Sequence, residues 1–161
     1  MAEIAIRRAT AEDAGAIHAM VVALARETGQ EAFITSTIEL IRRGGFDEAP
    51  AAFEAFLALR GRDVVGLALY FYEFSTWRGR RGVYIQDLYV AADARGAGLG
   101  RRLVGAVAAR GAAKGASYIK LAVDRANDEA AAFYARLGFS ERSEDRIFAL
   151  DGKAFEALSR G

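Results

Sequence analysis

The stretch VYIQDLYVAADARGAGLGRRLV, residues 83–104, decides the fold of this chain. Its first part alternates between two faces and is rich in β-branched and aromatic residues, which indicates a strand ending at Val90. From Gly100 onward, apolar residues recur at helical spacing, with Leu103 and Val104 among them. The turn Arg95-Gly96-Ala97-Gly98-Leu99-Gly100 joins the two. A strand, a glycine-rich turn and a helix in this order present unpaired backbone amides to one point, which predicts an anion site.

The spacing of the glycines narrows the kind of anion site. Glycines at 96, 98 and 100 let the backbone approach a phosphate closely, and the arginines at 95, 101 and 102 add positive charge. A P-loop is excluded because no Gly-Lys-Ser/Thr follows, and a dinucleotide fingerprint fails because Arg101 or Leu103 stands where its third glycine belongs. From the residues alone, a pyrophosphate cradle and a tight connection without any ligand both remain open.

The rest of the chain alternates between strand and helix patterns. We expect strands at 4–8, 51–59, 64–74, 83–90, 118–123 and 146–150, and helices at 10–27, 36–44, 100–114, 128–137 and from 153 onward. The turn Gly61-Arg62-Asp63 predicts a hairpin between the second and third strands. No repeat, linker or low-complexity tract interrupts this order, so residues 1–161 are expected to form one α/β (α+β) domain.

Composition sets limits on the function. The 161 residues carry 22 Lys and Arg against 21 Asp and Glu, a formal net charge of +1, which argues against nucleic acid or a membrane surface as partner. The chain has no cysteine and one histidine, so thiolate and multi-histidine metal sites are excluded and no metal is expected. The N-terminus lacks the apolar run of a secretory signal, and a cytoplasmic protein is expected.

Three separated motifs carry a family resemblance. The pattern Arg-x-x-Gly-x-Gly following Asp87-Leu88-Tyr89-Val90 resembles the signature of the GNAT superfamily of coenzyme A-dependent N-acetyltransferases. The pieces Tyr70-Phe71-Tyr72 and Ser75-Thr76-Trp77 are similar to the diamine (spermidine/spermine) acetyltransferase branch. The resemblance implies the GNAT fold, a single mixed, mostly antiparallel sheet of about six to seven strands, splayed at the centre and flanked by about four helices.

The resemblance also implies an acetyl-CoA site and a general acid. The segment Asn127 to Tyr134 matches the family's last long helix, in which the tyrosine protonates the coenzyme A sulfur. Without the resemblance, Tyr134 is better interpreted as an ordinary aromatic core residue at the end of an amphipathic helix. The residues implied in acetyl-CoA binding are Leu88, Tyr89, Val90, Arg95, Gly96, Ala97, Gly98, Leu99, Gly100, Arg101, Asn127 and Tyr134.

The proton acceptor is less clearly defined. The diamine branch carries a Glu-Asp pair where this chain has Gln86-Asp87, and Gln86 cannot accept a proton. Asp87, a water chain, or an amine that arrives neutral are the three alternatives. His18 could also be proposed, but its place among apolar residues of the first predicted helix favours a half-buried or surface side chain.

The acceptor side departs from the diamine branch at several positions. Glu27, Trp77, Gln86 and Asp87 are the substrate-binding candidates, while Thr28 and Asp145 stand where that branch has other residues. Carboxylates including Glu31 and Glu73 form either an acidic entrance for a cationic amine or a solvated surface. The basic residues Arg78, Arg80 and Arg81 mark a charged hairpin tip or a docking patch.

These features lead to one functional prediction with two alternatives. The chain is expected to transfer an acetyl group from acetyl-CoA directly to a primary amine of a small cationic molecule, either a diamine or polyamine or a lysine-like compound. The alternatives are an acetyl-CoA-binding regulatory module without turnover, suggested by Gln86, and an enzyme that acetylates protein lysines or N-termini. The resemblance also implies a homodimer.

Overall fold

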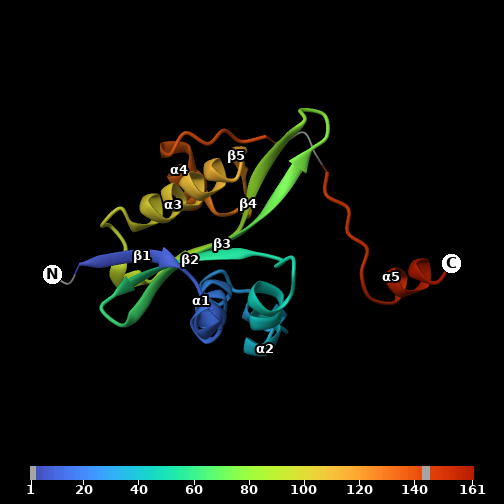
Figure 1. Ribbon diagram of the computed structural model, residues 1–161, viewed down its shortest axis with the longest axis horizontal. Coiled ribbons are helices and arrows are strands. Elements are labelled where there is room, and N and C mark those ends of the chain that lie inside the picture. Colours follow the sequence, from blue (N-terminus) through green and yellow to red (C-terminus); the bar gives the residue numbers. More distant parts are fainter. Residues whose placement is uncertain (1–2, 143–145) are drawn as a thin grey trace. The chain divides into compact units, whose positions relative to one another are not determined.

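The computed structural model describes residues 3–142 and 146–161 (Figure 1). The chain divides into two compact units, Met1–Ala122 and Val123–Gly161, and each is described by itself. The prediction that residues 1–161 act as one domain therefore stays a prediction.

The first unit is built on a five-stranded sheet in the order β1-β2-β3-β4-β5. The strands are β1 (Ile4–Arg8), β2 (Glu54–Arg60), β3 (Asp63–Ser75), β4 (Arg80–Val90) and β5 (Ala116–Lys120). The first four pair antiparallel, and β5 lies parallel to β4. The predicted hairpin between β2 and β3 is confirmed, and Gly61 at its turn adopts a φ of +64°, which a residue without a Cβ adopts at low cost.

Helices cover both faces of this sheet (Figure 1). Helices α1 (Ala14–Glu27) and α2 (Ile38–Arg42) lie on one side, and α3 (Leu99–Ala113) lies on the other. Short 3-10 turns occur at Ala11–Asp13, Glu31–Phe33 and Ala92–Ala94, and a π-helical turn at Arg43–Asp47 follows α2. The predicted capping box is present, with the Thr10 amide donating to Asp13 Oδ2 at 2.8 Å.

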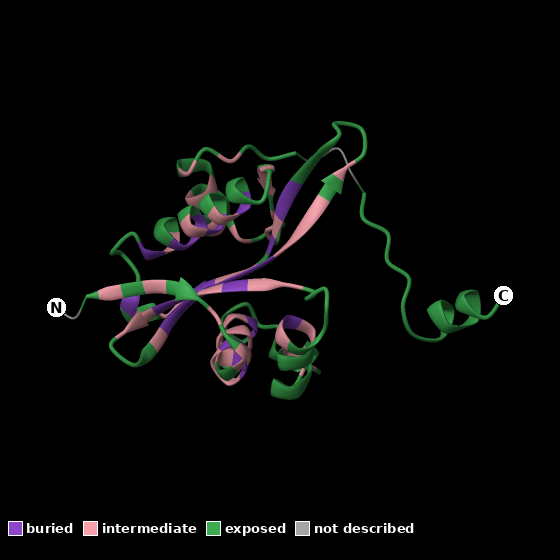
Figure 2. Cartoon of the chain, viewed as in Figure 1, coloured by how far each residue is buried: buried purple, intermediate pink, exposed green. Residues whose placement is uncertain are grey.

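The core occupies both faces of the central strands, where the buried residues gather in Figure 2. On the α1 side, Ile17 packs with Leu57 and Leu67, all fully buried. On the other side, α3 comes so close to β4 that a Cβ on Gly111 would lie 2.8 Å from Val83 Cγ2. Each fully buried aliphatic side chain contributes about 1.5–3 kcal/mol, so both layers stabilise the sheet.

Two irregularities in β4 shape the middle of the sheet. Opposite β3, the register moves from Leu69↔Asp87 to Tyr70↔Ile85, which leaves Gln86 in a β-bulge. Opposite β5, the pairing ends at Tyr84↔Lys120, while β4 continues to Val90. The two strands therefore part beyond Lys120, as the predicted splay requires.

The second unit contains α4 (Asp128–Arg136) and α5 (Gly152–Ser159). Asn127 caps α4, since its Oδ1 accepts a hydrogen bond from the Ala130 amide at 3.0 Å. The chain leaves the helix at Gly138, whose φ is +97°.

Four predictions about the elements need correction. The expected six to seven strands are five in the described residues, and five α-helices are formed where about four were expected. The strand expected at 118–123 is Ala116–Lys120. Residues 146–150 form no strand, and Ile147 and Phe148 are 90% and 85% exposed. Apolar residues favour a strand only where a neighbouring strand pairs with them, and the described residues of the second unit contain no strand that could do so.

Candidate active site

The loop before α3 has the geometry of an anion site. Gly96 and Gly98 adopt φ values of +86° and +70°, and Gly98 caps the helix without any side-chain hydrogen bond. The Arg102 amide donates to the Gly98 carbonyl at 3.1 Å and begins the helical hydrogen bonding. The amides of residues 99–101 precede that bond, so they and the positive end of the helix dipole can face an anion.

The space around this loop fits a ligand that approaches the backbone. A Cβ built on Gly96 or Gly98 meets no atom within 4 Å, so these positions need glycine for their backbone conformation and not for packing. The residues present therefore suit a pyrophosphate held by backbone amides.

Two of the three arginines at the loop, Arg95 and Arg102, are engaged within the protein. Arg95 Nε donates to the Val90 carbonyl at 2.9 Å, and its Nη2 donates to Glu27 Oε2. Tyr89 Oη donates to the other carboxylate oxygen of Glu27 at 2.9 Å. Arg102 Nη2 donates to the Ile4 carbonyl at 2.8 Å. These bonds tie the loop to the end of α1 and to β1.

Glu27 therefore has protein partners, although the sequence singled it out as a substrate-binding candidate. The hydrogen bonds from Arg95 and Tyr89 lower the pKa of its carboxyl, against the opposing effect of burial. The carboxylate positions Arg95, and a contact between Glu27 and the acceptor stays a prediction.

Asp87 lies beside the bulge of β4. Its side chain is half-buried, and burial raises the pKa of its carboxyl above the ordinary value. The neighbouring Gln86 is exposed. A carboxylate whose pKa is raised is a better proton acceptor than an ordinary surface aspartate, so the environment of Asp87 suits a general base.

Trp77 is not brought close to Asp87 within the first unit. It lies in the turn between β3 and β4 and is 99% exposed. Ser75 pairs with Arg80 at the tip, whereas Leu69 pairs with Asp87, a separation of roughly 20 Å along the strand.

Tyr134 lies in the second unit, on α4. Its ring contacts Phe133 and Phe139 with centroid distances of 5.1 and 5.5 Å. Burial raises the pKa of its hydroxyl to about 12, so the phenol is protonated at neutral pH and can donate a proton.

His18 is half-buried on α1, and its Nε2 lies 2.9 Å from the Ser36 carbonyl oxygen. This contact uses the ring nitrogen as a donor and agrees with the structural role expected for it. Asp145 lies outside the described residues.

Sequence reasoning did not single out Glu54, and it did not identify the partner of Glu73. Glu54 accepts a hydrogen bond from Tyr70 Oη at 2.7 Å and pairs with Arg110 on α3 at 3.2 Å. Glu73 pairs with Lys120 at 3.3 Å. The alternation within each strand could have assigned these residues to faces, but the cross-strand pairs depend on a register that the sequence does not reveal.

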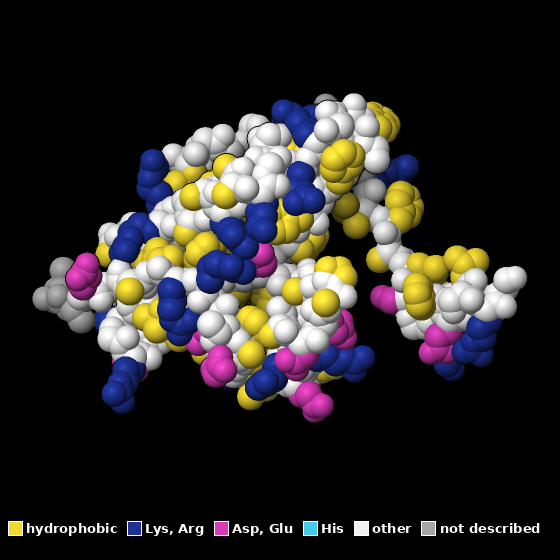
Figure 3. Space-filling model, viewed as in Figure 1, with side chains coloured by type: hydrophobic (Ala, Val, Ile, Leu, Met, Phe, Trp, Pro, Cys, Tyr) yellow, Lys and Arg dark blue, Asp and Glu magenta, His cyan; other side chains and the backbone are white. Residues whose placement is uncertain are grey.

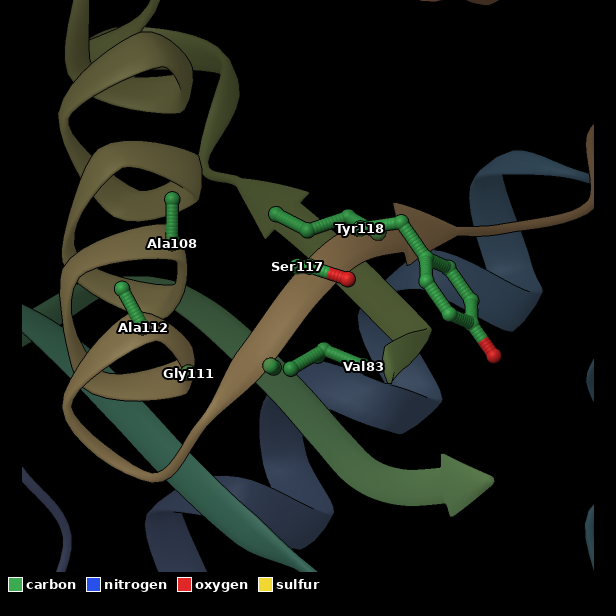
Figure 4. A pocket seen from close by; sticks show the side chains of 8 residues that line it. Val83, Ala108, Gly111, Ala112, Ser117 and Tyr118 are labelled. Atoms are coloured by element: carbon green, nitrogen blue, oxygen red, sulfur yellow. The ribbon is translucent and has the colours of Figure 1, made fainter. Parts of the chain in front are cut away.

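Two cavities in the first unit are lined by few side chains that could take part in a reaction. A cavity of about 260 Å³ between α3 and β5 is lined by small and apolar side chains, with Ser117 and Tyr118 on β5 (Figure 4). A second, of about 400 Å³, lies by Pro50–Phe53 and the adjoining part of β3. Within residues 3–142 and 146–161, no group of three or more His, Cys, Asp or Glu could hold a metal ion, and no helix is long and apolar enough to cross a membrane.

The comparison with known protein families identifies the class. Residues 18–139 match the model of the acetyltransferase (GNAT) family. Together with the glycine loop, the bulged strand and the splay, this match shows that the chain belongs to the GNAT family and is an acetyltransferase.

The names of two relatives state the substrate on which each of those proteins acts. The chain is 34% identical over 170 residues to thialysine N-epsilon-acetyltransferase of Mus musculus, covering 99% of each chain. It is 30% identical over 109 residues to L-ornithine N5-acetyltransferase of Arabidopsis thaliana, covering 66% of this chain and 48% of that protein. Among solved structures, an integron cassette protein from the mobile metagenome of V. cholerae has a TM-score of 0.78 at 18% identity, covering 100% of this chain and 99% of that one. This likeness supports the fold.

Proposed function

We propose that this acetyltransferase takes its acetyl group from acetyl-CoA and transfers it directly to a primary amine of a small, lysine-like or diamine molecule. The observation that supports acetyl-CoA as donor is the loop 95–101. There, left-handed glycines and a helix end without a side-chain cap leave backbone amides available to a pyrophosphate. The relatives that act on thialysine and ornithine support an amine on a side chain as the acceptor.

Two side chains supply the proton transfers. Asp87, directly or through water, accepts the proton of the ammonium, so that the neutral amine attacks the carbonyl carbon and forms the new C–N bond. As the C–S bond breaks, Tyr134 donates its proton to the departing sulfur, and the second proton of the attacking nitrogen leaves through water and restores the Tyr134 phenol. The raised pKa of each group matches its role, because Asp87 binds a proton more readily than an ordinary aspartate and Tyr134 stays protonated at neutral pH.

The test is thiol release from acetyl-CoA with a panel of diamines, polyamines, lysine analogues and aminoglycosides. The Tyr134→Phe variant should lower kcat with little change in the KM for acetyl-CoA, because the ring is kept and only the proton donor is lost. Acetyl-CoA binding without thiol release for any amine would instead favour the regulatory module. Unchanged kcat in Tyr134→Phe would remove this tyrosine from the mechanism.

We further propose that the enzyme is a cytoplasmic homodimer. Large apolar side chains are exposed in the C-terminal part, with Phe155 at 58% and Leu158 at 73% on α5, and Figure 3 shows the apolar side of this helix. Such residues are enriched in subunit interfaces. Light scattering of the full chain and of a Leu158→Glu variant tests the oligomeric state.

A further inference from the structure

A cluster of polar side chains lies on one face of β3 and β5. Glu73 Oε1 is 3.3 Å from Lys120 Nζ, and burial and the Glu73 carboxylate raise the pKa of the Tyr118 hydroxyl. We call Glu73, Tyr118 and Lys120 the polar trio. Lys120 stands at the last paired position of β5, where β4 and β5 begin to part.

The polar trio shares its face of the sheet with Asp87. Leu69 packs with Ile17 of α1 and pairs with Asp87 across the strands. Because side chains alternate along a strand, Phe71 and Glu73 point to the same side as Leu69. Phe71 stacks on Tyr84 with a centroid distance of 5.1 Å, which confirms that the facing strand presents its side chains to the same side.

The absence of a side chain at Gly82 allows the three side chains of the polar trio to lie close together. Gly82 pairs with Glu73, and a Cβ at this position would lie 2.1 Å from Tyr118 Cζ. The missing side chain lets the Tyr118 ring lie across β4 toward Glu73. Figure 4 shows this ring directed away from α3, on the opposite side of β5 from Ala108 and Ala112.

The charges around the trio are of both signs. The Arg80 guanidinium lies 6.0 Å from the centroid of the Tyr118 ring. The Lys120 side chain is 62% exposed and that of Glu73 is 26% exposed, so a ligand can reach both charges. One carboxylate flanked by two cations is complementary to a molecule that carries an ammonium and a carboxylate on the same carbon.

We propose that the polar trio and Arg80 bind the α-ammonium and α-carboxylate of a free amino acid whose side-chain amine is acetylated. Glu73 receives the ammonium, and Lys120 and Arg80 receive the carboxylate. A diamine or polyamine brings a second ammonium and no carboxylate, so the same cations repel it. This inference rests on the proposed acetyl transfer and names the acceptor class of that site.

The spacing along the sheet agrees with this arrangement. Asp87 pairs with Leu69, and Glu73 lies four positions beyond Leu69 on β3, or ~13 Å further along the strand. Lys120 pairs with Tyr84, which itself pairs with Phe71, midway between Leu69 and Glu73. The stacked Phe71 and Tyr84 rings lie between the two ends and offer an apolar floor to the methylene chain of the acceptor.

The test compares acceptors that differ only in the carboxylate. Lysine and cadaverine form one pair, and ornithine and putrescine form another. The wild-type kcat/KM should favour the amino acid of each pair. In Lys120→Met, loss of a hydrogen bond to a charged group should lower kcat/KM for lysine by about 10-fold to 100-fold, mostly through KM, and leave cadaverine little changed. Gly82→Ala, which displaces the Tyr118 ring, should cause the same selective loss.

Lys114→Met is the matched control, because it makes the same change at an exposed lysine at the end of α3 and should leave both substrates unaffected. Equal wild-type activity on lysine and cadaverine, or an equal loss for both in Lys120→Met, would overturn this inference while leaving the acetyl transfer intact. Absence of thiol release with every amine would instead overturn the proposed function itself.

Discussion

Two tyrosines on the same face of β3 should respond in opposite ways to removal of the hydroxyl group. Tyr70 is fully buried, and its Oη donates to Glu54 Oε2 at 2.7 Å. The Tyr72 hydroxyl is also buried, but no described atom forms a hydrogen bond with it. The two rings contact each other at a centroid distance of 6.1 Å, so Tyr→Phe at either position changes one oxygen in a shared environment.

The magnitudes follow from these contacts. A hydrogen bond to a charged group contributes about 1.5–3 kcal/mol, and the Glu54 carboxylate, at 21% exposure, can recruit water in its place. We therefore expect Tyr70→Phe to lower the free energy of unfolding by about 1.5–2 kcal/mol, or Tm by about 3–8 °C. Tyr72→Phe removes an unsatisfied group and should leave stability unchanged or raise it by about 1 kcal/mol.

Urea unfolding followed by far-UV circular dichroism measures both changes, and equal m-values would show that the denatured states are comparable. The reasoning would be refuted if Tyr72→Phe lost as much stability as Tyr70→Phe, because the hydroxyl of Tyr72 would then have a partner.

Three other predictions follow from single positions. Asp87→Asn should lower kcat and remove the acid limb of the pH profile. Since burial raises the folded-state pKa of Asp87, the wild type loses stability as pH rises through that pKa, and the variant should gain Tm relative to it at neutral pH. Gly98→Ala should raise the KM for acetyl-CoA and cost about 1 kcal/mol of stability at a φ of +70°, as steady-state kinetics and thermal unfolding would show. Asn127→Ala removes the cap of α4 and should cost about 0.5–2 kcal/mol in the same unfolding assay.

Local chemistry made part of the fold predictable. The hairpin at Gly61, the capping box at Thr10 and the helix after Gly98 each depend on residues that are close in sequence, so short patterns were sufficient to predict them. The segment 146–150 failed because its strand character needed a partner strand, which no local pattern supplies.

The candidate site was predictable in its loop but not in its contacts. The Arg95–Glu27 bond joins residues 68 positions apart, and the bulge at Gln86 follows from the register of β3 against β4. The polar trio also depends on three strands meeting over Gly82. These features require the assembled sheet, since a shift of one residue would send each side chain to the opposite face.

The bonds of Arg95 and Arg102 have a consequence for how the loop attracts a polyanion. Both guanidinium groups donate to partners in the protein, Arg95 to Glu27 and Val90 and Arg102 to Ile4. We therefore expect oriented peptide dipoles at contact distance to contribute to the attraction at the loop, together with the exposed side chain of Arg101. Dissolved ions screen interactions over about 8–10 Å at ordinary ionic strength, but they weaken a direct amide contact much less. We therefore expect the part of donor binding that the loop amides supply to depend less on salt concentration than the part that arginine charges supply.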